Sequence, residues 1–134
     1  MTQYLAVDEV LVIHEQMIRL FGGRPDVHDF TLLHSAVERP KATFGGSDLY
    51  ATLFGKAAAL IQSLILNHPF DDGNKRTAIT SCAAFLAKNG WILKLPKKES
   101  IQFTLDVDSH KLSLEEIASW IKRRKHHLPK SSLD

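Results

Sequence analysis

The chain has 134 residues, a formal net charge of +2, 44% hydrophobic residues and one cysteine. This length suits one domain with a single core, and so small a charge gives no ground by itself for nucleic-acid binding. A single cysteine excludes a disulfide framework, and the sequence has neither a secretory signal pattern nor an apolar run that could span a bilayer. We therefore expect a soluble, cytoplasmic protein with one domain over residues 1–134.

The N-terminal third has the apolar periodicity of helices. One face of the first segment carries Val7, Leu11, His14, Ile18 and Phe21. This pattern predicts a helix that ends at Gly22-Gly23. Asp29 is the predicted N-cap of a second, short helix, which Pro40 ends.

A loop and then the most apolar helix follow. The segment 41–48 contains Gly45-Gly46 and is predicted to be a loop. Asp48 is a candidate cap for a helix from about Leu49 towards Asn67. Because the last turns of that helix are almost wholly apolar, we expect it at the centre of the core.

The pattern in the second half of the sequence predicts three more helices. The first runs from about Asn74 to Lys88, with Gly90 just past its end and Cys82 inside it as a small buried hydrophobe. Residues 91–95 are read as an extended connector, because no strand partner is evident nearby. Residues 98–107 are predicted to be helical.

Ser113 with Glu116 forms a capping box that begins the last helix. The basic tail, residues 122–134, is expected to fray. The predicted fold class is therefore all-α, a compact bundle of about six helices.

The most informative stretch joins the central apolar helix to the next one: His68-Pro69-Phe70-Asp71-Asp72-Gly73-Asn74-Lys75-Arg76. A helix N-terminus offers unpaired N–H groups and the positive end of the helix dipole, so it binds anions. Lys75 and Arg76 add two cations where that dipole already disfavours them. They call for a compensating anion, which a phosphate would supply.

Each polar residue of this loop has a structural and a chemical interpretation. His68 either closes the preceding helix or acts as a general base near neutral pH. Asp72 is either a turn or cap residue or a ligand of Mg²⁺ that bridges phosphates. Gly73 permits a positive φ and a close approach of a ligand to the backbone. Asn74 either caps the helix or orients a phosphate.

This stretch resembles the signature loop of the Fic/Doc family. The typical Fic loop reads H-P-F-x-[DE]-G-N-G-R-x-x-R and the Doc loop reads H-x-F-x-[DN]-[AG]-N-K-R. Where Fic proteins have glycine, the chain has Lys75, which is the residue found in Doc proteins. Where Fic proteins have a second arginine, the chain has Ile79. The resemblance covers roughly residues 7–121 and implies a compact Fic/Doc-like bundle with the active-site loop between the central apolar helix and the following one.

The resemblance to the Doc branch implies a toxin of a toxin–antitoxin system. It implies transfer of the γ-phosphoryl group of ATP to a Ser or Thr hydroxyl of elongation factor Tu, which inhibits translation. His68 would be the base and Asp72 the Mg²⁺ ligand, while Asn74, Lys75 and Arg76, with the backbone at Gly73, would bind ATP and stabilise the phosphoryl group.

The same resemblance implies that residues 39–48 lie over the site as a flap. The self-inhibitory [ST]-x-x-x-E-[GN] pattern is absent from the sequence. We therefore expect restraint by a Phd-like antitoxin whose disordered tail folds on the toxin, and contact with nucleic acid only through that antitoxin.

Three alternatives remain open. The first is a Fic-type adenylyltransferase, against which only Lys75 and Ile79 argue. The second is a non-catalytic nucleic-acid-binding or partner-binding domain that uses the basic tail from Lys122 to Lys125. The third is a metal site, although the histidines have no standard ligand spacing: His14, His28, His34, His110, His126 and His127.

Overall fold

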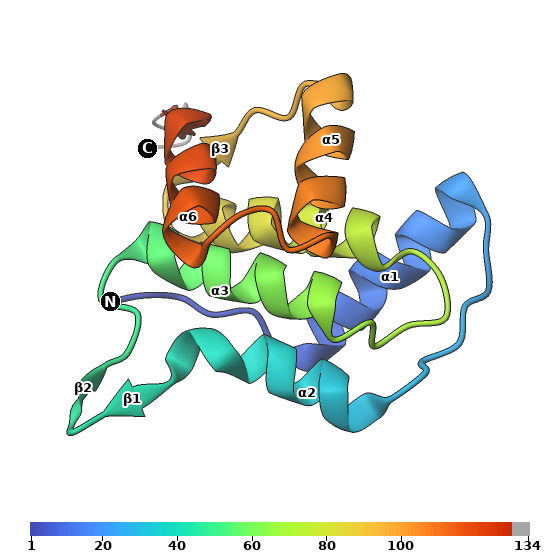
Figure 1. The fold of residues 1–134 in the computed structure, drawn as a ribbon, viewed down its shortest axis with the longest axis horizontal. Helices are drawn as coiled ribbons and strands as arrows, with labels where there is room; N and C mark the ends of the chain where they lie inside the picture. The colour runs from blue at the N-terminus through green and yellow to red at the C-terminus, as the bar shows by residue number, and fades with distance from the viewer. Residues whose placement is uncertain (130–134) are drawn as a thin grey trace.

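The computed structural model describes residues 1–129. This part of the chain contains six α-helices and four short strands, which confirms the predicted all-α class. Helix α3 (Leu53–Leu66) lies in the middle and contacts α2, α4, α5 and α6 (Figure 1). No helix within the described residues is long and apolar enough to cross a membrane.

The N-terminal helices agree with the sequence pattern. Helix α1 (Val7–Phe21) ends at Gly22, and helix α2 (Phe30–Glu38) begins after Asp29. The Asp29 carboxylate accepts the N–H of Leu32 at 3.1 Å, so the predicted cap is confirmed. Pro40 then lies in the short 3₁₀ helix η1 (Arg39–Lys41).

The segment predicted to be a loop forms a small antiparallel hairpin, β1 (Thr43–Phe44) with β2 (Ser47–Asp48). Asp48 does not cap α3, because the cap is Thr52, whose hydroxyl accepts the N–H of Gly55 at 3.0 Å. The Asp48 carboxylate instead pairs with the buried ammonium of Lys56 at 3.0 Å. This ion pair ties the hairpin to the start of α3.

Helix α3 forms the centre of the core, as predicted. Nine of its fourteen residues are buried. They pack against buried side chains of the neighbouring helices, among them Phe85 in α4, Phe103 in α5 and Ile121 in α6. An apolar helix surrounded in this way holds both of its ends in fixed positions, and its C-terminal end leads directly into His68.

The later helices also agree with their predicted starts. Helix α4 (Asn74–Lys88) is followed by Gly90 at a φ of +90°, and helix α5 (Lys97–Asp108) comes next. Helix α6 (Leu114–Arg123) begins with the predicted capping box, in which the Ser113 hydroxyl accepts the N–H of Glu116 at 3.1 Å. Cys82 is completely buried, and this burial raises the pKa of its thiol to about 12.

Two predictions for the C-terminal part are wrong. Strand β3 (Trp91–Leu93) is not a connector, because it pairs with strand β4 (Lys125–His127). The tail therefore does not fray over residues 122–129, although residues 130–134 lie outside the described part. The Trp91 ring stacks on His127 at 4.1 Å and fixes this pairing.

Candidate functional site

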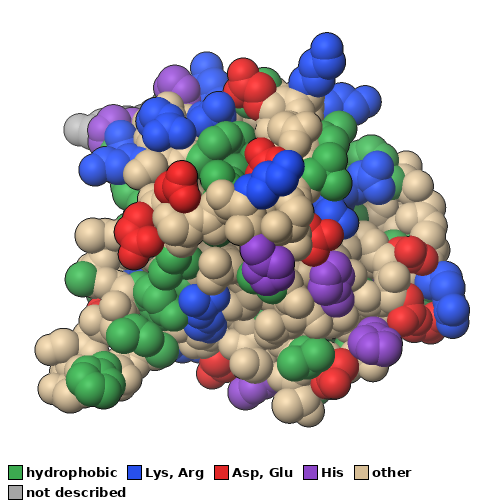
Figure 2. Space-filling model, viewed as in Figure 1, with side chains coloured by type: hydrophobic (Ala, Val, Ile, Leu, Met, Phe, Trp, Pro, Cys, Tyr) green, Lys and Arg blue, Asp and Glu red, His purple; other side chains and the backbone are tan. Residues whose placement is uncertain are grey.

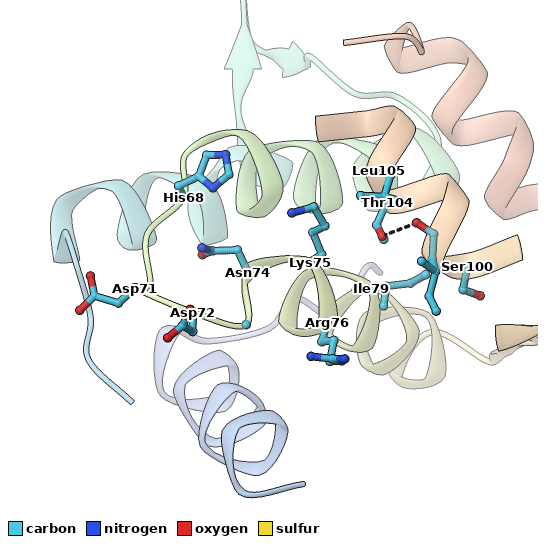
Figure 3. Close-up of a pocket in the computed structure, with 12 residues that line it drawn as sticks. His68, Asp71, Asp72, Asn74, Lys75, Arg76, Ile79, Ser100, Thr104 and Leu105 are labelled. Atoms are coloured by element: carbon cyan, nitrogen blue, oxygen red, sulfur yellow. Dashed lines mark hydrogen bonds between the residues drawn. The ribbon is translucent and has the colours of Figure 1, made fainter. Parts of the chain in front are cut away.

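The loop after α3 borders a cavity of about 470 Å³, and the start of α4 and one face of α5 complete its wall (Figure 3). The lining residues are His68, Asp71, Asp72, Gly73, Asn74, Lys75, Arg76, Ile79, Ser100, Ile101, Thr104 and Leu105. All six predicted site residues of the loop are among them. The chain folds so that the end of α3, the start of α4 and one face of α5 meet at one cavity.

His68 follows the last turn of α3 with an unusual backbone conformation. Its φ is +46°, a region that non-glycine residues seldom adopt. The imidazole is about half exposed, and its Nε2 lies 3.0 Å from a carboxylate oxygen of Asp108 at the end of α5. His68 therefore does not close α3 with its side chain but directs the ring towards α5.

Hydrogen bonds from residues of α1 and of the segment after it hold Asp72 in place. Its carbonyl oxygen accepts a hydrogen bond from Nε2 of the buried His14 at 2.8 Å, and its carboxylate Oδ2 accepts the N–H of Arg24 at 2.7 Å. A Cβ on Gly23 would come within 2.9 Å of the Asp72 Cβ, so that glycine allows the close approach. No hydrogen bond within residues 1–129 uses the other carboxylate oxygen, Oδ1.

That free oxygen bears on the predicted Mg²⁺ site. Mg²⁺ usually takes one or two carboxylates and completes its shell with water and substrate phosphates. The described residues contain no group of three or more acidic, histidine or cysteine side chains placed to hold a metal. Asp72 therefore fits a phosphate-assisted Mg²⁺ site but not a metal site made by the protein alone. The alternative of a histidine-based metal centre finds no support in residues 1–129.

Gly73 is the N-cap of α4 and has a φ of +79°. A Cβ at this position would lie 3.3 Å from the Ile18 side chain and 3.6 Å from His14, so α1 packs directly behind the turn. No side chain caps α4. The first N–H groups of the helix, from Asn74 onward, therefore face the cavity without an intrahelical acceptor.

The Asn74 side chain closes the loop. Its Oδ1 accepts the N–H of Phe70 at 3.0 Å, and its Nδ2 donates to the Phe70 carbonyl at 2.8 Å. With both ends of the amide used in this way, Asn74 can meet an anion through its backbone N–H. Phe70 is anchored in turn by a stack on His14, with ring centroids 3.7 Å apart.

The two cations at the start of α4 diverge. Figure 3 shows Lys75 extending towards His68, whereas Arg76 points to the opposite edge of the site. The Lys75 ammonium lies 3.2 Å from Asp108, and the Arg76 guanidinium lies over the Phe21 ring at 4.3 Å. The anion that the sequence pattern required near Lys75 is, in this structure, a carboxylate of the chain itself.

Sequence reasoning missed the contribution of α5. Ile101 and Leu105 form an apolar wall and are 52% and 45% exposed, beside the hydroxyl-bearing Ser100 and Thr104. Asp108 also went unnoticed. A carboxylate as the last residue of a helix faces the negative end of the dipole, and that mismatch is the signal that could have identified it.

Asp71 also faces the cavity. Its carboxylate pairs with Arg24 at 3.8 Å and lies 3.5 Å from His28. These contacts bind the loop to the segment between α1 and α2. The N–H of Asp71 also donates to the Asp26 carbonyl at 3.1 Å. These contacts indicate that Asp71 holds the loop in place.

The hairpin predicted to cover the site lies elsewhere. None of residues 39–48 lines the cavity, and Figure 1 shows β1 and β2 at the opposite end of α3 from the His68 loop. At 1.5 Å per residue, the fourteen residues of α3 separate its two ends by about 20 Å. The flap prediction is therefore wrong for this structure.

The basic tail has structural partners. Figure 2 shows Lys and Arg side chains gathered along the upper edge of the molecule, where α5 begins and α6 ends. The Arg124 guanidinium stacks over Trp120 at 3.9 Å and pairs with Glu99 at 2.9 Å, and Lys125 lies over Trp91 at 4.7 Å. These contacts account for two of the cations without a nucleic acid.

Comparison with known proteins agrees with the resemblance of the loop. A family model described as the Fic/DOC family matches residues 4–86, which include the whole loop from His68 to Arg76. The chain is 49% identical over 90 residues to Toxin Doc of Mycolicibacterium smegmatis, and the match covers 67% of each chain. It is 25% identical over 121 residues to the protein kinase doc of Escherichia phage P1, covering 90% of this chain and 94% of that protein.

Proposed function

This chain belongs to the Fic/DOC family, and from that premise we propose that it is a Doc-type toxin with protein kinase activity. It would move the γ-phosphoryl group of ATP to a Ser or Thr hydroxyl of elongation factor Tu and so inhibit translation. Two relatives, one named as a toxin and the other as a protein kinase, support this proposal. The choice of elongation factor Tu rests on the resemblance to the Doc branch alone.

The observation that carries the proposal is the position of Lys75. Its ammonium stands between the uncapped start of α4 and His68, at the place where the Fic loop has glycine. A lysine side chain there fills space that the α- and β-phosphates need in the adenylylating pose. Ile79, which lines the same cavity, replaces the second Fic arginine and removes a cation from that pose. Both features favour transfer of the terminal phosphoryl group.

Different residues of the site would perform different parts of the phosphoryl transfer. His68 accepts the proton of the attacking hydroxyl as the new oxygen–phosphorus bond forms and the bond between the γ-phosphorus and the β-phosphate oxygen breaks, releasing ADP. Lys75 and the N–H groups at the start of α4 stabilise the charge on the phosphoryl oxygens. Arg76 adds a cation at the far edge of the cavity.

Asp72 is the residue that would hold Mg²⁺, through the carboxylate oxygen that Arg24 leaves free. When bound, Mg²⁺ would supply positive charge that stabilises the phosphate groups of the nucleotide. The hydrogen bonds from His14 and Arg24 hold Asp72 at the cavity before any nucleotide arrives.

A Phd-like antitoxin is the proposed partner. Large apolar side chains stand exposed on the N-terminal helices: Val12, Leu20, Phe21, Phe30 and Leu32. A disordered tail that folds on binding buries such side chains in an apolar groove. If the antitoxin docks there, Val12→Asp lowers its affinity, whereas Ile101→Asp on the distant helix α5 does not. Equal losses in both variants would contradict this docking surface.

Label transfer tests the proposed reaction. Purified protein is incubated with elongation factor Tu and either α-labelled or γ-labelled ATP, with His68→Ala as the control variant. The proposal predicts label on the target from the γ position only, and none with His68→Ala. Label from the α position would identify an adenylyltransferase instead, and no label from either position would refute phosphorylation of this target.

A further inference from the structure

Asp108 connects the two central residues of the site from a third element. It is the last residue of α5, and each of its two carboxylate oxygens contacts a different residue of the site. Oδ1 lies 3.0 Å from Nε2 of His68, and Oδ2 lies 3.2 Å from the Lys75 ammonium. Asp108 lies outside residues 4–86, the part that the family model matches. One carboxylate therefore fixes how the proposed base and the proposed phosphate-binding cation lie relative to each other.

The charges explain why this contact forms. Lys75 stands at the positive end of α4 and Asp108 at the negative end of α5, so each is unfavourable in its own helix. Brought together, the two side chains compensate each other. Partial burial raises the pKa of Asp108, but the hydrogen bonds and charges of Lys75 and His68 outweigh that effect and hold it below its ordinary value.

Stability alone gives little reason for this arrangement. The Lys75 side chain is 36% exposed and that of Asp108 27% exposed, and ion pairs so close to solvent contribute little to folding. The contact does have a geometric consequence. Within residues 1–129, Asp108 is the one hydrogen-bond partner of the His68 ring, which is otherwise half exposed and free to rotate about its side-chain bonds.

The chemistry of the contact also selects a tautomer. An ionised carboxylate only accepts hydrogen bonds, so Nε2 of His68 must carry the proton. In the neutral ring, the lone pair then resides on Nδ1. A carboxylate that holds one ring nitrogen orients the imidazole and stabilises the imidazolium that forms when the other nitrogen takes a proton.

We propose that Asp108 is a positioning residue for the proposed phosphoryl transfer: it holds His68 in the Nε2–H tautomer and leaves Nδ1 as the atom that accepts the hydroxyl proton. The inference rests on the proposed function for the reaction it serves. The proton passes from the target hydroxyl to Nδ1, and the resulting positive charge faces the Asp108 carboxylate. By pairing with Lys75 as well, Asp108 keeps that ammonium beside the ring before the phosphate arrives.

The tautomer can be measured without any reaction. The ¹⁵N chemical shifts of a histidine ring distinguish a protonated from an unprotonated nitrogen, and a His68→Gln variant assigns the His68 signals. For the neutral ring we expect Nε2 protonated in the wild type and a mixture of tautomers in Asp108→Ala. Asp106→Asn is the matched control, because Asp106 lies on α5 and its side chain contacts Gln102 rather than the site. A wild-type ring protonated on Nδ1 overturns the proposal, even if every Asp108 variant fails to fold.

Kinetics separate positioning from a structural role. Asp108→Asn keeps the shape of the side chain but removes the charge that stabilises the imidazolium. We expect kcat to fall about 10- to 100-fold, while KM for ATP stays constant or falls because Lys75 is released. Asp106→Asn should leave both constants unchanged. An unchanged kcat in Asp108→Asn overturns the proposal, and so does an increased one, which would mean that Asp108 restrains the site.

The two proposals fail separately. A wild-type protein that transfers no label refutes the proposed function, whatever the ring tautomer. A wild-type protein that transfers label but lacks the Nε2–H tautomer refutes the role of Asp108 alone.

Discussion

His14 offers the sharpest test of how the loop is held. It is 3% exposed on α1, stacks on Phe70 and donates its Nε2–H to the carbonyl of Asp72. His14→Phe keeps an aromatic ring that can stack on Phe70 but removes the donor. Because the lost hydrogen bond is partly buried, we expect a loss of about 1–2 kcal/mol in the free energy of unfolding. His14→Ala also loses the aromatic stack, worth roughly 1 kcal/mol, and leaves a cavity.

Urea unfolding measures this loss. With a denaturant dependence of about 2 kcal/mol per M for a domain of this size, His14→Phe should unfold at a midpoint about 0.5–1 M lower than the wild type. Label transfer should fall as well, because Asp72 loses one of its two supports. His34→Phe, on the exposed face of α2, is the matched control and should match the wild type. If His14→Phe also matched the wild type in both assays, the loop would not depend on the hydrogen bond that α1 donates to it.

Four further predictions follow from the contacts above. Lys75→Ala should lower the rate of label transfer about 100-fold, since it removes a cation aimed at the phosphoryl oxygens, yet change the free energy of unfolding by less than about 1 kcal/mol; a large stability loss would show that the pair is structural. The lowered pKa of Asp108 means that its stabilising contribution is complete above about pH 4 and is lost as the pH falls through the folded-state value, so acid unfolding of Lys75→Ala should depend less on pH than that of the wild type. Identical acid-unfolding curves for the two proteins would contradict this. Cys82 should not react with a thiol reagent at pH 8 until the protein is unfolded, and rapid labelling of the native protein would show that the α4 core opens readily. Arg39→Ala should cost about 3 kcal/mol in urea unfolding, because the guanidinium donates hydrogen bonds to Tyr50, Gln62 and Ser63; a loss below about 1 kcal/mol would mean that water replaces these partners.

The helices were predictable because their signals are local. The apolar periodicity of residues 7–21, the Asp29 cap and the Ser113 capping box each depend on residues within a few positions of one another. The same holds for the loop from His68 to Arg76, whose residue types and spacing predict a phosphate-binding turn. In each of these cases the backbone geometry follows from neighbours in the sequence.

The errors concern contacts between distant segments. Strand β3 pairs with β4, more than thirty positions along the chain, and nothing in residues 91–95 specifies that partner. Asp48 is a residue type that often caps helices, but its attraction to the buried Lys56 holds it in a hairpin instead. Asp108 reaches the site only because α5 packs against α3 and α4, which is a property of the assembled core.

Transfer of the terminal phosphoryl group of ATP can be tested by measuring both products of the reaction. Wild-type protein is mixed with elongation factor Tu and unlabelled ATP, and the nucleotide products and the intact mass of the target are measured together. We expect ADP, formed in step with a target heavier by one phosphoryl group, and neither product with His68→Ala. Pyrophosphate together with a target heavier by one adenylyl group would contradict it.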